Sequence, residues 1–204
     1  MLVKQKNGFT LLEIMVVVAI VGIVSGLGIY NLLSMLPQIR ANSAARQVSS
    51  DMQWARLKSV SENNDVIITF YSPDGTGAYR YEILDDDNNN GSTDSGEALF
   101  TGDKYTLPVT IRFGRATSGI ERTTCGGEIG SSGIHFTGNK ITFQPSGRPN
   151  KNGSVYIIPI KEDENNEKKT INWRAISVTT NGRIKTWIYD ASVENCASGL
   201  GPWR

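Results

Sequence analysis

The feature that most limits what this chain can fold into is an apolar stretch that runs from Phe9 to Leu36. About 20 apolar residues in a helix cross the hydrocarbon core of a bilayer, so the stretch predicts a transmembrane helix. Lys4 and Lys6 precede it, and the positive-inside rule therefore places the N-terminus in the cytoplasm. No cleavage site of small residues follows the stretch, so we expect the span to be retained.

One carboxylate, Glu13, interrupts the beginning of this stretch. A lone charge in a span costs about 2.5–3.5 kcal/mol on insertion scales. The stretch from Phe9 to Leu36 holds no basic residue that would pair with it. Two interpretations remain open: the side chain reaches the membrane interface from near the helix end, or another molecule supplies a positive partner.

The segment 8–13, Gly-Phe-Thr-Leu-Leu-Glu, resembles the type IV prepilin motif. The resemblance implies that prepilin peptidase cuts after Gly8, which makes residues 1–8 a leader. It further implies that Phe9 becomes the methylated N-terminal residue. In this family the glutamate, here Glu13, neutralises the N-terminal amine of a neighbouring subunit during assembly.

Beyond the predicted span, residues 37–63 predict an amphipathic helix. Small and apolar residues recur at three- and four-residue spacing, namely Ala41, Ala45, Val48, Met52 and Ala55. We expect this stripe to pack against a sheet, with Trp54 and Leu57 deepening the contact. Asn63, Asn64 and Asp65 predict the end of the helix.

The remaining residues, 64–204, predict an antiparallel β domain. Strands are expected at 66–71, 79–84, 109–113, 134–136, 141–143, 155–160, 175–179 and 184–188, with a turn at 73–75 and loops at 114–133 and 161–170. Asn181-Gly182 predicts a hairpin between the last two strands. The predicted fold class is α+β: one long helix, transmembrane and then amphipathic, packed on an antiparallel β-sheet domain, as in pilins.

Three further segments, 53–59, 143–148 and 176–185, are similar to the GspH/FimT/FimU group of minor pilins and pseudopilins. The resemblance implies a structural subunit of a type IV pilus or a type II secretion pseudopilus, at or near the tip, that helps to initiate assembly. Its implied partners are other pilin subunits, prepilin peptidase and the inner membrane. The implied location is a single inner-membrane pass with a periplasmic globular domain, and later the filament.

The two cysteines, Cys125 and Cys196, predict a disulfide, because both have loop-like flanks in a chain with an export-like N-terminus. The alternative is a pair of unrelated buried thiols. His135 is the only histidine, and its place in a predicted strand favours a structural role. With both cysteines paired, no nucleophile–base set can be assembled, so no enzymatic activity is expected.

The segment 86–97 fits a twelve-residue calcium-loop pattern, with Gly91 sixth and an acidic residue last. The oxygen ligands would come from Asp86, Asn88, Asn90, Ser92, Asp94 and Glu97. The flanks look like strand ends, so this would be a calcium loop between strands. The alternative is a solvated loop whose Asp, Asn and Gly content matches by chance.

A second polar motif, Arg183 and Lys185 with Arg148, Lys151 and Arg174 elsewhere, is a candidate cationic patch. FimT-like pilins of DNA uptake carry a Gly-Arg-x-Arg motif in this region, but here the last position is lysine, which lacks the forked guanidinium. With the leader lysines removed, 19 basic side chains face 20 acidic ones, so the chain as a whole shows no polyanion-binding signature. The alternative is a hairpin turn with ordinary solvated charges.

Overall fold

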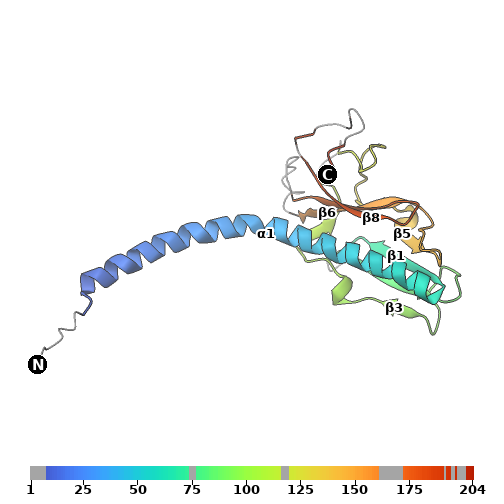
Figure 1. The fold of residues 1–204 in the computed structure, drawn as a ribbon, viewed down its shortest axis with the longest axis horizontal. Helices are drawn as coiled ribbons and strands as arrows, with labels where there is room; N and C mark the ends of the chain where they lie inside the picture. The colour runs from blue at the N-terminus through green and yellow to red at the C-terminus, as the bar shows by residue number, and fades with distance from the viewer. Residues whose placement is uncertain are drawn as a thin grey trace, which may run out of the picture. The chain divides into compact units, whose positions relative to one another are not determined.

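The computed structural model describes residues 8–73, 77–115, 120–160, 172–190, 192–193, 196 and 201–204, without the side chains of residues 27–31. Most of the predicted leader and the predicted loop at 161–170 lie outside the described residues, as does most of the turn at 73–75. The chain forms two units, Met1–Leu36 and Pro37–Arg204. One helix, α1, Leu11–Glu62, contributes residues to both (Figure 1).

Helix α1 begins and ends at residues whose chemistry suits a helix terminus. The Thr10 hydroxyl accepts a hydrogen bond from the backbone N–H of Glu13 at 3.2 Å, which satisfies one of the free amides of the first turn. Pro37 lies inside the helix without ending it. Asn63 adopts a positive φ of 60°, a conformation common just after a helix, so the predicted stop is confirmed.

The second unit holds two four-stranded antiparallel sheets. The first has the order β3-β2-β1-β5, made of Ala98–Phe100, Arg80–Asp86, Asp65–Tyr71 and Lys140–Phe143. The second has the order β4-β6-β7-β8, made of Ile111–Phe113, Gly153–Pro159, Arg174–Val178 and Ile184–Ile188. Two short 3-10 helices, Asp103–Tyr105 and Thr137–Asn139, connect strands. The α+β class is confirmed.

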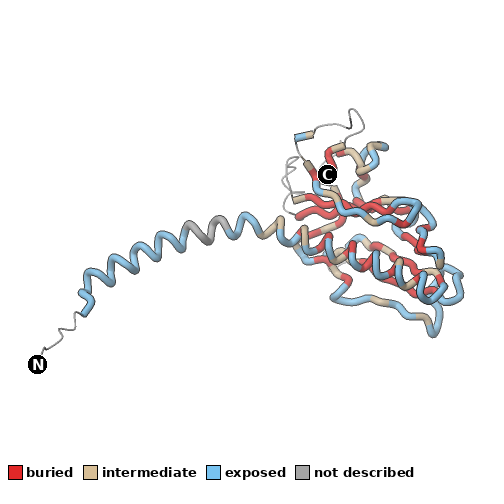
Figure 2. The backbone as a smooth tube through the Cα atoms, in the orientation of Figure 1, coloured by how far each residue is buried: buried red, intermediate tan, exposed pale blue. Residues whose placement is uncertain are grey.

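The main core lies between α1 and the inner faces of both sheets (Figure 2). All five residues of the predicted helix stripe are at most 1% exposed. They meet apolar side chains from both sheets, among them Ile68 and Phe143 of the first and Ile157 and Ile176 of the second. Trp54 contacts the first sheet as predicted: its ring meets Phe100 of β3 edge-on, with the ring centres 5.0 Å apart, although the side chain is 40% exposed. The predicted contact of Leu57 is wrong, because this side chain is 69% exposed.

A second apolar cluster covers part of the outer face of the second sheet. It joins Tyr156, Trp173 and Ala175 with residues of the 120–129 segment and with Trp203 near the C-terminus. This segment was expected to be only a loop, whereas its Ile120 and Ile129 are 4% and 1% exposed. The second sheet is therefore buried on both faces over part of its area.

Most predicted strands are confirmed within two residues, with one exception. Residues 134–136 form no strand and contribute only an isolated bridge between Ile134 and Val155. The Asn181-Gly182 hairpin is confirmed, with Gly182 at a φ of 75°. A side chain at that position would also meet the carbonyl oxygen of Gly147 at 2.4 Å, so both the backbone conformation and the close packing require glycine.

Candidate functional sites

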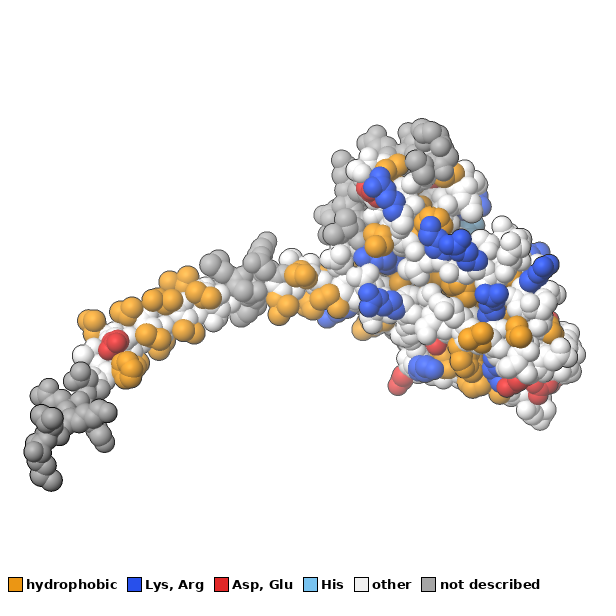
Figure 3. Space-filling model, viewed as in Figure 1, with side chains coloured by type: hydrophobic (Ala, Val, Ile, Leu, Met, Phe, Trp, Pro, Cys, Tyr) orange, Lys and Arg blue, Asp and Glu red, His pale blue; other side chains and the backbone are white. Residues whose placement is uncertain are grey.

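The N-terminal segment presents an apolar surface that this chain does not cover. Between Phe9 and Val24, the large apolar side chains are 50–79% exposed, and Figure 3 shows them along the visible face of the helix. Among the described residues, the Glu13 carboxylate has neither a hydrogen bond nor an ion pair, although its backbone N–H is bound to Thr10. Within the described part of the chain, no helix is both long enough and apolar enough to cross a membrane. The span expected at 9–36 stays a prediction.

The three segments that resemble the GspH/FimT/FimU group meet at the C-terminal end of α1. The Ser59 hydroxyl donates to the Gln144 carbonyl at 3.0 Å, and Arg56 Nε donates to the Gly147 carbonyl at 2.8 Å. The hairpin turn with Gly182 packs against the same Gly147 carbonyl. These residues therefore join the end of the helix to one turn from each sheet. The three segments that resemble the family thus contact one another in the fold.

The acidic loop connects β2 to β3, between the strand ends that the sequence predicted. Its first residue, Asp86, is 1% exposed and accepts hydrogen bonds from the backbone N–H groups of Asn90 and Gly91 at 3.1 and 2.7 Å. Asn88 and Asn90 each accept a backbone N–H two residues further on, at 3.0 and 2.7 Å. Side-chain oxygens at alternating positions therefore stabilise the turns of this loop by accepting backbone N–H groups.

The acidic side chains of this loop are not gathered as a closed metal site. Asp94 accepts hydrogen bonds from the side-chain amides of Asn88, at 2.8 Å, and of Asn90, and these bonds lower the pKa of Asp94. Across the described residues, only Glu121 and the two cysteines bring three potential metal-ligating atoms within 4.8 Å of one another, and those sulfurs are bonded to each other.

One oxygen in the loop has unused bonding capacity. Glu97 Oε2 accepts the backbone N–H of Asp94 at 2.9 Å, whereas Oε1 is buried without a hydrogen-bond partner among the described residues. Such an atom is costly unless water or a cation meets it. Glu97 holds the last position of the calcium-loop pattern, and an unpartnered carboxylate oxygen is the kind of ligand that a hard cation prefers.

The loop is anchored to the end of helix α1. Lys58 Nζ lies 2.7 Å from a carboxylate oxygen of buried Asp85 and also contacts Glu62. The side-chain amide of Asn64 donates to Asp85 at 2.7 Å and to Asp87 at 2.8 Å. Figure 3 shows acidic side chains mainly along the lower edge of the domain and basic ones over the rest of the visible face.

The basic turn places Arg183 and Lys185 at the surface, as the predicted patch requires. Lys185 Nζ lies 3.3 Å from the centre of the Trp187 ring, in a cation–π contact. Arg174 does not belong to this patch, which corrects the prediction: it is 2% exposed and donates through Nε to Asn42 on α1 at 2.7 Å. No pattern in the sequence indicates that α1 carries a polar partner for Arg174.

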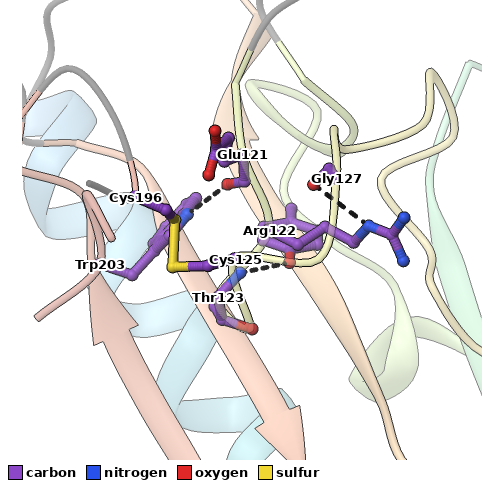
Figure 4. Close-up of a disulfide and its surroundings, with 8 residues drawn as sticks. Glu121, Arg122, Thr123, Cys125, Gly127, Cys196 and Trp203 are labelled. Carbon is purple, nitrogen blue, oxygen red and sulfur yellow. Dashed lines mark hydrogen bonds between the residues drawn. A yellow bond between two sulfur atoms is a disulfide. The ribbon is translucent and has the colours of Figure 1, made fainter. Parts of the chain in front are cut away.

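The disulfide between Cys125 and Cys196 is confirmed, with a Cα–Cα distance of 5.5 Å and a sequence separation of 71 residues. Figure 4 shows Trp203 beside it, donating from Nε1 to the Glu121 carbonyl at 2.8 Å. The bond ties the C-terminal region to the 120–129 segment and so holds the second apolar cluster over the sheet. His135 accepts the Gly130 N–H at Nε2, at 3.2 Å, and its ring meets Tyr156 edge-on.

The sequence matches two protein-family models, one over the globular unit and one at the N-terminus. Residues 44–182, more than half of the chain, match the family described as type II transport protein GspH. The chain belongs to the GspH family. Residues 3–29 match the prokaryotic N-terminal methylation motif, so the protein is a type IV pilin-like minor pilin or pseudopilin of the GspH/FimT/FimU group. The group consists of structural subunits that associate with other pilin subunits.

Two solved structures resemble this GspH-family chain. Both are crystal structures of the type IV minor pilin FimU of Pseudomonas aeruginosa, in space groups P21 and P65. The first is 15% identical with a TM-score of 0.44, and the alignment covers 76% of this chain and 94% of FimU. The second is 16% identical with a TM-score of 0.39, with 76% and 99% covered. No curated protein matches the sequence significantly.

Proposed function

We propose that this GspH-family protein is a filament subunit that enters a type IV pilus or a type II secretion pseudopilus through its N-terminal helix, at or near the tip. The observation that carries the proposal is the apolar surface between Phe9 and Val24, which is 50–79% exposed at its large side chains. A surface of this kind needs lipid or other subunits to cover it. A subunit at the tip would help to initiate assembly.

The proposed route begins in the inner membrane, with the globular domain in the periplasm. Prepilin peptidase cuts after Gly8, and the new N-terminal residue, Phe9, is methylated. The Glu13 carboxylate then meets the N-terminal amine of a neighbouring subunit at similar depth in lipid. Each charge relieves the desolvation cost of the other, which makes docking favourable only at the correct axial position. The absence of a carboxylate partner among the described residues supports this role.

Mass spectrometry of the protein from its native membrane tests the processing. We expect a mature chain that begins with N-methylated Phe9, and an intact Met1 in the assembled protein would contradict the proposal. Glu13→Gln should reduce the amount recovered in sheared filaments about tenfold or more, because the charge match is lost. Asp103→Asn, which removes an exposed carboxylate of the globular unit, is the control and should leave recovery unchanged.

Electron microscopy of cells lacking this subunit tests the position at the tip. A tip subunit that initiates assembly should change how many filaments form, while the filaments that do form keep their normal length. Fewer but normal filaments would support the proposal. An unchanged number, or filaments that are uniformly shortened, would contradict it.

We further propose that the acidic loop binds Ca²⁺, because Glu97 Oε1 is buried without a partner at the last position of the pattern. Asp86, Asn88, Asn90, Asp94 and Glu97 would supply side-chain oxygens, with Ser92 supplying a backbone carbonyl. Millimolar calcium should raise the melting temperature of the full-length chain in detergent. Glu97→Gln should abolish the increase, and Glu82→Gln, on β2 outside the loop, should preserve it. If millimolar calcium does not raise the melting temperature of the unaltered chain, the loop is not a calcium site.

Nucleic acid is a second candidate ligand, because Arg183 and Lys185 are exposed together on one hairpin. Contacts of these cations with phosphates would weaken with salt and would not depend on base sequence. The double substitution Arg183→Ala and Lys185→Ala should then abolish binding of a DNA duplex in a mobility-shift assay. Binding that survives this change would exclude the turn as its source.

A further inference from the structure

A groove of about 430 Å³ lies on the outer face of the second sheet, beyond the second apolar cluster. Ser154 of β6, Ser177 of β7 and Lys185 of β8 stand in register on three adjacent strands. Side chains alternate between the faces of a strand. Because the neighbouring Val155 and Ile176 belong to the main core, these three side chains are on the outer face.

The outer face of the second sheet changes from apolar to polar between two adjacent rows of residues. In the next row, Tyr156, Ala175 and Trp187 stand opposite one another, and the first two are fully covered by the second apolar cluster. The row of Ser154, Ser177 and Lys185 is polar instead, and the two serines line the groove. The apolar cover therefore gives way to polar contacts at this row, where Ser154 and Ser177 are 5% and 7% exposed.

The groove is built from side chains with fixed orientations. Trp187 Nε1 donates to the Ser177 hydroxyl at 2.7 Å, which leaves the hydroxyl hydrogen of Ser177 to be donated elsewhere. The hydroxyls of Thr123 and Ser154 lie 3.0 Å apart, in contact across the groove wall. The indole of Trp187 is thus held in place beside hydroxyl groups, with the Lys185 ammonium 3.3 Å from the centre of its ring.

Arg122 and His135 add a charge and a neutral ring to the lining. Arg122 Nε donates to the carbonyls of Gly127 and Glu128 at 3.3 and 3.1 Å, and no partner of its two terminal nitrogens is present among the described residues. Burial, and secondarily the nearby Arg122 charge, lower the pKa of His135, so its ring is neutral at pH 7. With Nε2 accepting a hydrogen bond from Gly130, the ring proton lies on Nδ1.

The composition of the groove indicates the chemistry of its ligand. Six of its twelve lining residues are serine or threonine, Asn152 adds an amide, Arg122 is the only cation and no carboxylate is present. Hydroxyls and amides match the hydroxyls of a sugar, an indole matches the apolar face of a sugar ring, and a guanidinium matches a carboxylate. We propose that this groove binds an acidic oligosaccharide, a chain of sugar rings that carry carboxylate groups.

A single-stranded polynucleotide fits the groove less well. Proteins that bind such strands use several cations along the backbone and successive aromatic surfaces for stacking. This groove offers one indole, Trp187, and two cations, Arg122 in the lining and Lys185 against the Trp187 ring, among many hydroxyls. The proposal does not depend on filament assembly, since none of the lining residues belongs to α1.

The test is calorimetric titration of the full-length chain in detergent with tetragalacturonate. We expect saturable binding that Arg122→Gln weakens about tenfold, because the carboxylate loses its charged partner. Trp187→Phe and Asn152→Ala should weaken it as well. Lys140→Gln, which removes one exposed charge from β5 of the other sheet, is the matched control and should leave binding unchanged. Cellotetraose, which has no carboxylates, should bind about tenfold more weakly.

Three outcomes would overturn the proposal. One is no binding of tetragalacturonate at millimolar concentration by the folded, unaltered chain. Another is an equal loss of binding in Arg122→Gln and Lys140→Gln, which would indicate unspecific attraction. The third is a single-stranded oligonucleotide that binds more tightly than tetragalacturonate and whose binding is abolished by Arg122→Gln. That result would assign the groove to nucleic acid. None of these results bears on the recovery of Glu13→Gln in filaments, so the two proposals fail separately.

Discussion

The two parts of helix α1 have the same backbone conformation but opposite environments. Val17, in the first part, is 52% exposed, whereas Val48, in the second, is fully buried. The first part is apolar on all sides, and the described residues supply nothing to cover it. The second part has one stripe of small and apolar residues, and two sheets cover that stripe. Helical structure alone therefore does not set what a helix contacts; the distribution of apolar residues around it does.

This comparison implies that the stability of the molecule resides in Pro37–Arg204 and that the exposed stretch from Phe9 to Val24 contributes little to it. The following substitutions test that division, beginning with the largest expected effect.

Val48→Asp should lower the free energy of unfolding by about 5 kcal/mol, because it buries a carboxylate without a partner in the main core. Val17→Asp makes the same chemical change on the exposed part of the helix and should leave the unfolding of the globular unit unaltered. Thermal denaturation followed by circular dichroism, in detergent, measures both. Similar losses in the two variants would show that the division between the two parts is wrong.

Replacing both Cys125 and Cys196 with serine should lower the free energy of unfolding by about 4 kcal/mol in the chain-entropy model, because the bond closes a long loop. Urea denaturation of the full-length chain measures the loss. Reducing agent should destabilise the unaltered protein and leave the double variant unchanged. If reductant destabilises the double variant equally, the disulfide is not the cause.

Met52→Ala should cost about 3 kcal/mol, because it removes a side chain that is fully buried between the helix and the sheets. Leu57→Ala, five residues further along, should change stability by less than about 0.5 kcal/mol, since Leu57 is 69% exposed. Chemical denaturation compares the two. A large cost at Leu57 would mean that the outer face of the helix is covered within the chain.

Asp65→Asn should have the smallest effect, a gain of a few tenths of a kcal/mol at neutral pH. Burial, and then the Asp86 charge, raise the pKa of Asp65 in the folded protein. A raised carboxyl pKa means that the fold favours the protonated form, so the unaltered protein loses stability as pH rises through that pKa. Denaturation at pH 3 and pH 7 should show the gain only at pH 7, and an equal gain at both would refute the electrostatic cause.

The helix and most strands followed from local signals, and the disulfide followed from the presence of only two cysteines, both with loop-like flanks. The stripe from Ala41 to Ala55 repeats at helical spacing, and Asn181-Gly182 marks a hairpin, so neighbouring residues carried the information. The division into two sheets did not follow, because it depends on which strands pair across long separations. The failure at Leu57 has a related cause: an apolar residue near a buried stripe need not belong to it, because burial depends on what packs against that face of the helix.

Among the candidate sites, too, those built from neighbouring residues were predicted and those built from distant residues were missed. The positions of the acidic loop and the basic turn were predicted, because each is a short run of polar residues between strands. The burial of Arg174 against Asn42 was missed, because these residues lie 132 positions apart. The groove was missed as well, since its hydroxyls come from separate strands and from the 122–124 segment. The only signal of the groove in the sequence was Trp187, which follows Lys185 by two residues.

The sequence by itself determined the membership in a pilin-like family, the processing motif and the alternation of apolar and polar residues that makes each element. These properties depend on residues close together in the chain, whose order is fixed by covalent bonds. The tertiary structure decided which face of α1 is buried, how the strands divide between two sheets and where the outer face of the second sheet is left open. Those outcomes depend on packing between distant segments, where burial of apolar surface and pairing of buried polar groups select one arrangement.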